Sequence, residues 1–181
     1  MTHPDPFSII CQWGDPALRE KARAVEDFDT ALGEQVAELM QVMFDADGAG
    51  LAATQVGVLR RIFVYRLGEE PPSIVVNPVI THRGEETETG LEGCLSLGQA
   101  RVLVEVERAT EVTVEAQTLR GEPIRIEAEG MRARILQHEI DHLDGVLMLD
   151  RTSPEQAKAA KRALARGEPY RPPRAEDEAG P

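Results

Sequence analysis

Residues 137–145 of this chain read Gln-His-Glu-Ile-Asp-His-Leu-Asp-Gly, which contains the pattern His-Glu-x-x-His. On an α-helix, positions i and i+4 lie one above the other, with Cβ atoms about 5 to 6 Å apart. The imidazoles of His138 and His142 can therefore reach one metal ion. Glu139 is rotated by about 100° from His138, which keeps it from binding the metal directly but leaves it close to a water molecule on the metal.

An apolar stripe supports a helix through this motif. Large apolar side chains recur at helical spacing, at Met131, Ile135, Leu136, Ile140 and Leu143. Gly130 marks a start, and Gly145 stands where a C-terminal cap belongs. The alternative is a helix with two unrelated histidines, which a chain with only four histidines seldom forms by chance. The stretch therefore predicts a metal-binding helix.

Two histidines leave the metal without a complete set of ligands. In the longer metalloprotease pattern a third ligand follows three residues after the glycine, but here that residue is Met148, whose thioether is a poor ligand for a borderline divalent ion. Glu155 and Glu168 are downstream alternatives. Cys94, in the sequence Glu-Gly-Cys-Leu-Ser, is the better donor, although a single cysteine is also consistent with a buried free thiol. A Cys-His-His set leaves an open fourth position, which is typical of catalytic sites.

Length and composition limit the class of protein. At 181 residues with 41% hydrophobic content, the chain is expected to form one globular domain. A net charge of −12 argues against a nucleic-acid partner bound through a general basic surface. The N-terminus lacks the basic and apolar regions of a secretion signal, and no apolar run approaches the ~18 residues of a membrane span. We therefore expect a cytoplasmic protein without membrane contact, in which Cys11 and Cys94 are not presumed to form a disulfide.

The order of the expected elements favours an α+β fold. A short extended segment is expected at residues 8–13, and a first helix from Thr30, as its N-cap, to Asp45. Strands are expected at residues 61–67, 73–80, 102–106, 111–118 and 123–129, the last two as a hairpin. Because the strands cluster before the His-Glu-x-x-His helix, we predict mostly antiparallel sheets packed around that central helix, with an N-terminal and a C-terminal helix beside them.

A glycine-rich segment precedes the strands. Residues 48–57 read Gly-Ala-Gly-Leu-Ala-Ala-Thr-Gln-Val-Gly. Small residues allow another backbone to approach closely, and the amide of Gln55 can donate to an oxyanion. Taken alone, the segment is a weak signal that is more consistent with a tight Gly/Ala-rich turn, and it lacks the spacing of a phosphate-binding loop.

Residues 48–55, 92–96 and 137–142, in this order, resemble the three signature motifs of peptide deformylase. Residues 14–19, Gly-Asp-Pro-Ala-Leu-Arg, also resemble the N-terminus of that family, and the likeness runs from about Ile9 to Arg151. The intact Glu-Gly-Cys-Leu-Ser motif and the helix-prone extension after Ser153 are most similar to the bacterial type.

The resemblance implies a metal-dependent hydrolase that removes the formyl group from the N-terminal formyl-methionine of new polypeptides and releases formate. It implies that Cys94, His138 and His142 bind one divalent metal ion. Ferrous iron is the implied physiological ion, and zinc, nickel or cobalt can occupy the site.

The resemblance also implies a role for each remaining site residue. Glu139 takes a proton from the metal-bound water, the hydroxide attacks the formyl carbon, and Glu139 then protonates the leaving amine. The oxyanion is held by the metal, the Gln55 side-chain amide and the Leu95 backbone N–H. The peptide binds as an extended strand beside the small residues Ala49, Gly50 and Gly93. The methionine side chain enters a pocket lined by Met131, Ile135 and the aliphatic stem of Arg134.

Two positions leave questions open. Gly98 stands where the family commonly has proline, and the run from Cys94 to Arg108 is slightly longer than usual, so the rigidity of this loop is in question. Asp141 faces partly away from the metal. It is expected either to support the histidines, to cap the helix, or to be exposed to solvent.

We expect residues 1–167 to form one catalytic domain and residues 168–181 to form a disordered, acidic and Pro-rich tail. The helix-prone stretch 154–166 is locally basic, and in the bacterial type such a helix can contact the ribosome near the tunnel exit. Two other classes of protein are considered. A zinc peptidase would use a glutamate as third ligand. A non-enzymatic binding module with a structural metal would need a fourth protein ligand, for which Cys11, His3 and His82 are poor candidates.

Overall fold

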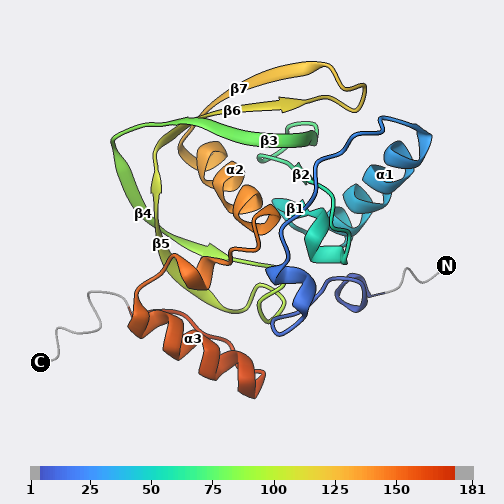
Figure 1. Ribbon diagram of the computed structural model, residues 1–181. Helices are drawn as coiled ribbons and strands as arrows, with labels where there is room; N and C mark the ends of the chain where they lie inside the picture. Colours follow the sequence, from blue (N-terminus) through green and yellow to red (C-terminus); the bar gives the residue numbers. More distant parts are fainter. Residues whose placement is uncertain (1–4, 174–181) are drawn as a thin grey trace, which may run out of the picture.

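The computed structural model describes residues 5–173 and contains two antiparallel sheets and three α-helices (Figure 1). The helices are α1 (Thr30–Asp45), α2 (Gly130–Leu143) and α3 (Pro154–Arg166). The strands are β1 (Gly50–Ala52), β2 (Ile62–Tyr65), β3 (Ser73–Arg83), β4 (Thr87–Gly93), β5 (Leu103–Ala109), β6 (Glu111–Gln117) and β7 (Pro123–Glu129). One sheet has the order β1-β2-β3-β6-β7, and the other is the β4–β5 pair. The expected α+β class with antiparallel sheets is confirmed.

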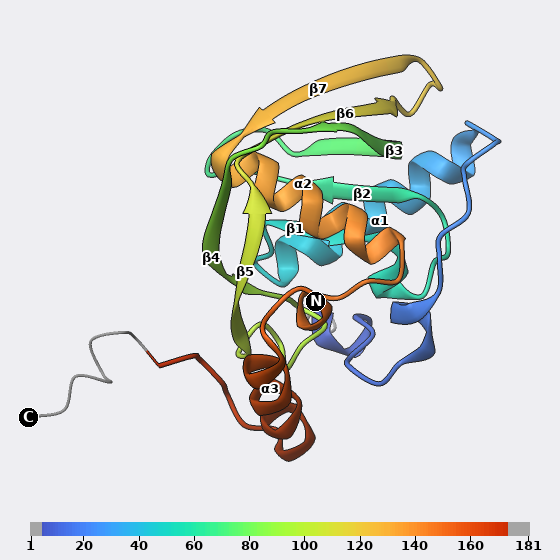
Figure 2. The same cartoon turned by 60° about the vertical axis from the view of Figure 1, so that its left-hand side comes forward.

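Helix α2 lies between the two sheets (Figure 2). It packs against strands of the five-stranded sheet on one side and against β5 on the other. Helix α1 covers the opposite face of the five-stranded sheet, and strand β2 is therefore buried on both faces. Phe63 and Tyr65 of β2 point toward α2, whereas Ile62 and Val64 pack with α1, as the two-residue period of a strand requires.

The hairpin β6–β7 leads directly into α2. Its register runs from Glu111 opposite Glu129 to Gln117 opposite Pro123, so the hairpin prediction is confirmed. Gly130 has a φ of +55° and forms the corner between β7 and the helix. This corner joins β7 to the first turn of α2, and the helix then contacts both the five-stranded sheet and β5.

Several local predictions were wrong. Helix α1 is capped by Asp29, which accepts a hydrogen bond from the N–H of Leu32 at 2.9 Å, and not by Thr30. Residues 8–13 form no strand. Strands β1 and β4 were missed. Strand β4, Thr-Glu-Thr-Gly-Leu-Glu-Gly, has a single large apolar residue and two glycines, so it lacks a strand pattern of its own. It forms because all seven of its residues pair with β5.

The loop between β4 and β5 explains the absent proline. Gly98, Gln99 and Ala100 have φ values of +61°, +57° and +61°. Proline fixes φ near −65°, so it cannot occupy position 98 in this conformation. A Cβ at Gly98 would lie 3.3 Å from Leu164 of α3. Three consecutive residues of this loop therefore have φ angles in the left-handed region, and the loop packs against α3.

Residues 168–173, the first part of the expected tail, are described by the structure and include a residue that pairs with the loop before β5. The N–H of Tyr170 donates to the carbonyl of Arg101, and the N–H of Leu103 donates to the carbonyl of Tyr170, at 3.1 and 2.8 Å. The ordered chain thus continues past residue 167, and the rest of the expected tail, residues 174–181, lies outside the described residues. None of the helices in residues 5–173 is long and apolar enough to cross a membrane.

Candidate metal centre

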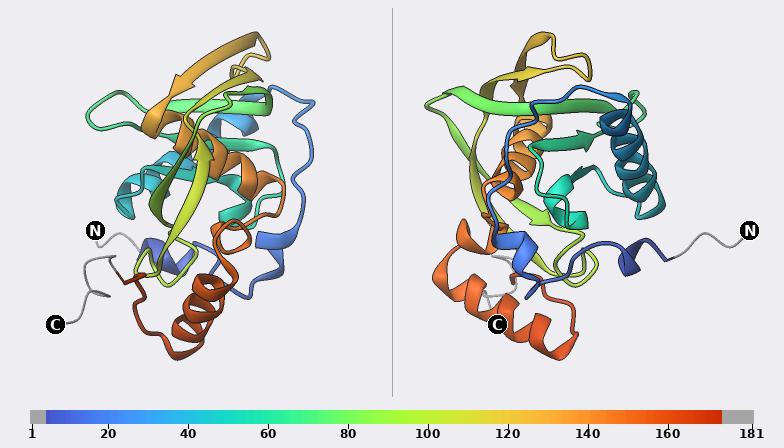
Figure 3. Two further views of the ribbon diagram at one scale, coloured as in Figure 1. Left: turned by 90° about the vertical axis from the view of Figure 1, so that its left-hand side faces the viewer. Right: turned by 45° about the vertical axis from the view of Figure 1, so that its right-hand side comes forward.

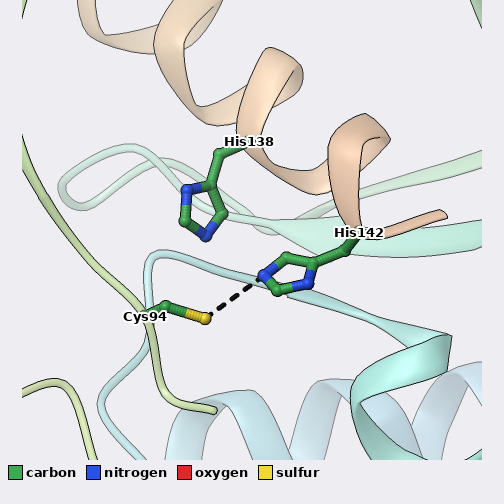
Figure 4. Close-up of side chains that lie close together, drawn as sticks. All are labelled: Cys94, His138 and His142. Carbon is green, nitrogen blue, oxygen red and sulfur yellow. Dashed lines mark hydrogen bonds between the residues drawn. The ribbon is translucent and has the colours of Figure 1, made fainter. Parts of the chain in front are cut away.

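Cys94, His138 and His142 meet between α2 and the end of β4 (Figure 4). One potential ligand atom from each residue lies within 4.8 Å of the other two, and the Cys94 Sγ is 3.2 Å from the His142 Nε2. The two histidines are one helical turn apart, as the motif requires, with ring centroids separated by 5.0 Å. Cys94 directly follows the last residue of β4. Within residues 5–173, this is the one group of three such side chains with metal-binding spacing.

The donor set fits a divalent transition metal. Thiolate and imidazole ligands suit zinc and iron, and three protein ligands leave a fourth position open, as in catalytic sites. Burial lowers the pKa of His142, and the positive charges of His138 and Arg108 lower it further. His142 is therefore neutral, which is the form that binds a metal.

His138 is oriented by a buried carboxylate. Its Nδ1 lies 2.9 Å from the Oε2 of Glu92, which leaves Nε2 available for a metal. Burial by itself would raise the pKa of Glu92, but hydrogen bonds from Arg108 and His138 outweigh it and hold that pKa well below its usual range. Glu92 therefore remains ionised and keeps the imidazole in one orientation.

A network of ion pairs extends from Glu92 behind α2. The guanidinium of Arg108 donates from Nε and Nη2 to the two carboxylate oxygens of Glu92, each at 2.9 Å, and from Nη1 to Asp141. Arg151 donates to the other oxygen of Asp141 at 2.7 Å. Asp141 is only 8% exposed, so it supports the network and does not face solvent. Sequence reasoning missed Arg108, whose only signal is a charged residue at an alternating position otherwise occupied by valines in β5.

Glu139 lies in a confined, buried position beside His138. It is 4% exposed, and its Oε2 has no hydrogen-bond partner among residues 5–173. Burial raises its pKa to about 7. A Cβ at Gly50 would lie 2.3 Å from Oε1 of Glu139, so only glycine at position 50 leaves room for the carboxylate. The glycine-rich segment and the motif helix therefore meet at this carboxylate.

The side chain of Gln55, from the short 3-10 helix after β1, contacts the sulfur of Cys94. Its Oε1 accepts a hydrogen bond from the N–H of Ala52 at 2.8 Å. Its Nε2 donates to Ser96 Oγ at 3.1 Å and to the sulfur of Cys94 at 3.5 Å. These contacts fix the amide orientation, with its nitrogen toward Cys94 and Ser96. The Cδ1 of Leu95 would lie 2.9 Å from a Cβ at Gly48, so this glycine also permits close packing.

A cavity of about 310 Å³ opens beside Glu139. It is lined by residues that the sequence singled out, namely Ala49, Gly50, Gln55, Gly93, Cys94, Leu95, Met131, Arg134, Ile135, His138 and Glu139. The guanidinium of Arg134 donates hydrogen bonds to Glu92 and to the carbonyls of Val106 and Glu88, so its charge is directed at these groups and not into the cavity. The sequence did not predict that this arginine joins α2 to the β4–β5 sheet.

The chain resembles known proteins along most of its length. The sequence profile described as "Polypeptide deformylase" matches residues 7–158. The peptide deformylase of Thermotoga neapolitana is 46% identical over 154 residues, which cover 85% of this chain and 89% of that protein. The crystal structure of peptide deformylase from Thermotoga maritima superimposes with a TM-score of 0.77 at 45% identity, covering 80% of this chain and 97% of that one.

A third relative was solved with a bound small molecule. The peptide deformylase from Synechococcus elongatus, in complex with actinonin, matches with a TM-score of 0.82 at 36% identity, covering 88% of this chain and 87% of that one. The identity, coverage and superposition agree with the three motifs and with the Cys-His-His arrangement. The chain therefore belongs to the polypeptide deformylase family, metal-dependent hydrolases that remove the formyl group from the N-terminus of new polypeptides.

Proposed function

We propose that this protein hydrolyses N-formyl-methionyl polypeptides to formate and methionyl polypeptides, with one divalent metal ion held by Cys94, His138 and His142. One observation carries the proposal. The sulfur of Cys94, far away in sequence, lies within ligand distance of both helix histidines, beside a buried carboxylate that has a free oxygen. Cys94, His138 and Glu139 line one cavity, which supports a metal site beside a proton acceptor.

The bound ion would act as a Lewis acid and lower the pKa of a water molecule toward neutrality. We propose ferrous iron as the physiological ion, with zinc, nickel or cobalt as possible occupants, because the thiolate and imidazole donors suit all of them. In this proposal α2 is the metal-binding helix at the centre of the fold, and residues 1–167 form one catalytic domain.

Glu139 serves as the proton carrier. Its unpartnered oxygen can accept the proton of the attacking water, and the same carboxyl can then protonate the leaving amine. A pKa raised to about 7 by burial suits both steps near neutral pH, because the group must accept a proton and give it up again in each turnover.

Gln55 and Leu95 hold the oxyanion that forms on the formyl oxygen. The amide nitrogen of Gln55 lies beside the sulfur of Cys94, and the amide oxygen of the same side chain accepts a hydrogen bond from the N–H of Ala52. The backbone N–H of Leu95 belongs to the next peptide unit after the metal ligand. Two donors fixed before the reaction are expected to stabilise the developing charge without reorganisation.

The peptide substrate lies in the cavity as an extended strand. Ala49, Gly50 and Gly93 provide backbone edges without bulky side chains. Met131, Ile135 and the stem of Arg134 line the part that receives the methionine side chain. Because the Synechococcus relative was solved with actinonin, we expect actinonin to inhibit this protein as well.

The two other classes of protein are not favoured. Among the described residues, neither Glu155 nor Glu168 joins the metal-binding group, so a peptidase ligand set is not formed. Cys11 and His82 do not join it either, and His3 lies outside the described residues. A metal held by three protein ligands is typical of catalysis and not of a structural site.

We also propose that α3 docks on the ribosome, and that the protein acts in the cytoplasm. Lys158, Lys161 and Arg162 are exposed on α3 and can face phosphates. Replacing all three with glutamate is expected to abolish salt-sensitive co-sedimentation with ribosomes while activity on a short peptide is kept. Equal co-sedimentation of wild type and variant would contradict the docking proposal.

Formate release from a formyl-Met-Ala-Ser peptide tests the main proposal. Anaerobically purified wild type is expected to release formate, and Glu139→Ala is expected to lose at least ~10²-fold in kcat while keeping its metal. Cys94→Ala is expected to lose the metal itself, whereas a peptidase with a glutamate ligand would retain it. A fully metallated wild type that releases no formate would contradict the proposed function.

A further inference from the structure

Residues 10–13, near the N-terminus, run alongside the turn that carries Cys94 and Leu95 (Figure 3). The backbone N–H of Cys11 donates to the carbonyl of Gln55 at 2.7 Å. The side-chain amide of Gln12 donates to the carbonyl of Leu95 at 3.1 Å. One short segment therefore contacts both residues that we propose to hold the oxyanion.

Of these contacts, the one from Gln12 depends on the identity of the side chain. Its Nε2 lies 3.1 Å from the carbonyl oxygen of Leu95 and 3.2 Å from that of Ile10. A primary amide nitrogen carries two hydrogens, so it can donate to both acceptors. The reversed amide would place an oxygen against two carbonyl oxygens, and the observed orientation is therefore the favourable one.

The turn after β4 depends on support of this kind. Strand β4 ends one residue before Cys94, and residues 98–100, further along the loop, have left-handed φ values, which residues other than glycine seldom adopt. The peptide unit before Leu95 is held within the turn, because the carbonyl of Cys94 accepts from the N–H groups of Leu97 and Ala100 at 2.9 and 3.0 Å, whereas the units after Leu95 are held from outside it. The side chain of Gln12 donates to the carbonyl of Leu95, and the N–H of Trp13 donates to the carbonyl of Ser96 at 2.8 Å.

We propose that Gln12 is a positioning residue for deformylation, which fixes the direction of the Leu95 N–H by holding the carbonyl of the same residue. The inference rests on the proposed function. The carbonyl of Leu95 belongs to the peptide unit after this residue, and the N–H belongs to the unit before it. The two units share the Cα of Leu95, so a rotation of the first is expected to displace the second. Hydrogen bonds weaken steeply as their angle departs from linearity, so a displaced N–H would stabilise the oxyanion less. Gln12 does not line the cavity.

The variant Gln12→Met, in the metal-loaded full-length protein, tests this role because it keeps the side-chain length and removes both donated hydrogen bonds. We expect kcat for formyl-Met-Ala-Ser to fall about three- to tenfold, well short of the ~10²-fold loss that follows removal of an oxyanion donor. KM and metal content are expected to stay unchanged, because the weakened contact forms only as the oxyanion develops.

Two further variants distinguish positioning from folding. Gln12→Lys keeps a donor and is expected to retain more than half of the wild-type kcat. Gln41→Met is the matched control, since Gln41 lies on the exposed side of α1 and its amide donates to Asp45 at 2.8 Å. It is expected to leave kcat unchanged.

A kcat for Gln12→Met within twofold of wild type would overturn the inference, even if its thermal unfolding midpoint is lower. A fall in kcat that matches a fall in bound metal would also overturn it. A metal-loaded wild type without activity would contradict the proposed function and, with it, this inference.

Discussion

The two sides of the metal centre are built differently. Behind His138 lies a charged side, defined by Glu92, Arg108, Arg134, Asp141 and Arg151, in which ion pairs that are buried except at Arg151 hold the imidazole of His138. Around Cys94 and His142 lies a neutral side, defined by Gln12, Thr54, Gln55 and Ser96, in which only uncharged hydrogen bonds are made. Buried charges are costly to leave without a partner, whereas single neutral hydrogen bonds contribute little. The charged side should therefore determine stability, and the neutral side should adjust catalysis.

The largest effect is expected from Arg108→Met. The change leaves Glu92 and Asp141 with fewer partners in a buried site, which is expected to lower the free energy of unfolding by about 3 to 5 kcal/mol. Urea denaturation measures it. Arg125→Met is the matched control, because Arg125 pairs with Glu127 on the surface and should contribute less than about 0.5 kcal/mol. A loss below about 1 kcal/mol for Arg108→Met would show that the charged side is not structurally important.

The next effect concerns Glu139 and pH in the metal-free protein. Burial raises its pKa to about 7, whereas the unfolded chain keeps it near 4.5. Between these values the folded state binds more protons, so the free energy of unfolding should fall as pH rises from about 4.5 to 7, by about 3 kcal/mol. Glu139→Gln should remove this fall. Urea denaturation of both proteins at pH 5 and pH 8 measures it, and a difference between them that is the same at both values would contradict the assignment.

The pH dependence of stability that comes from Glu92 has the opposite sign to that from Glu139, because folding lowers the pKa of Glu92. Its contribution to stability is present above about pH 4.5 and is lost as pH falls further.

For Glu92→Gln we expect metal affinity to fall about 10- to 100-fold, since His138 loses the carboxylate that orients it. Zinc or cobalt titration against a chelator measures this. Glu88→Gln, on the same strand but exposed, is the control, and equal affinities in the two variants would contradict a special role for Glu92.

The smallest effect is expected from Ser96→Ala on the neutral side. It removes the hydroxyl that accepts from Gln55 at 3.1 Å, although the amide keeps its contact with Cys94. We expect a loss of about 1 kcal/mol in the free energy of unfolding and a reduced kcat at unchanged metal content. A loss as large as that of Arg108→Met would remove the distinction between the two sides.

Sequence reasoning identified the candidate ligands, which the structure brings together, more completely than the residues that support them. His138, Glu139 and His142 are separated by at most four residues, so helical periodicity alone places them on neighbouring faces. The partner of Glu92 at position 108 is sixteen residues away on the other strand of a hairpin, and β4 carries no strand pattern of its own. Alternation with the valines of β5 indicates that Arg108 points inward, but no local rule identifies Glu92 as its partner.

The sequence by itself determined the motif helix, the β6–β7 hairpin, the α+β class and the family, because each follows from short-range periodicity or from motifs in a fixed order. Only the tertiary structure decided how the site is held. The contacts from Glu92 to His138 and from Gln12 to Leu95 join residues 46 and 83 positions apart. Such contacts depend on how the sheets pack around α2, which no local pattern of residues specifies.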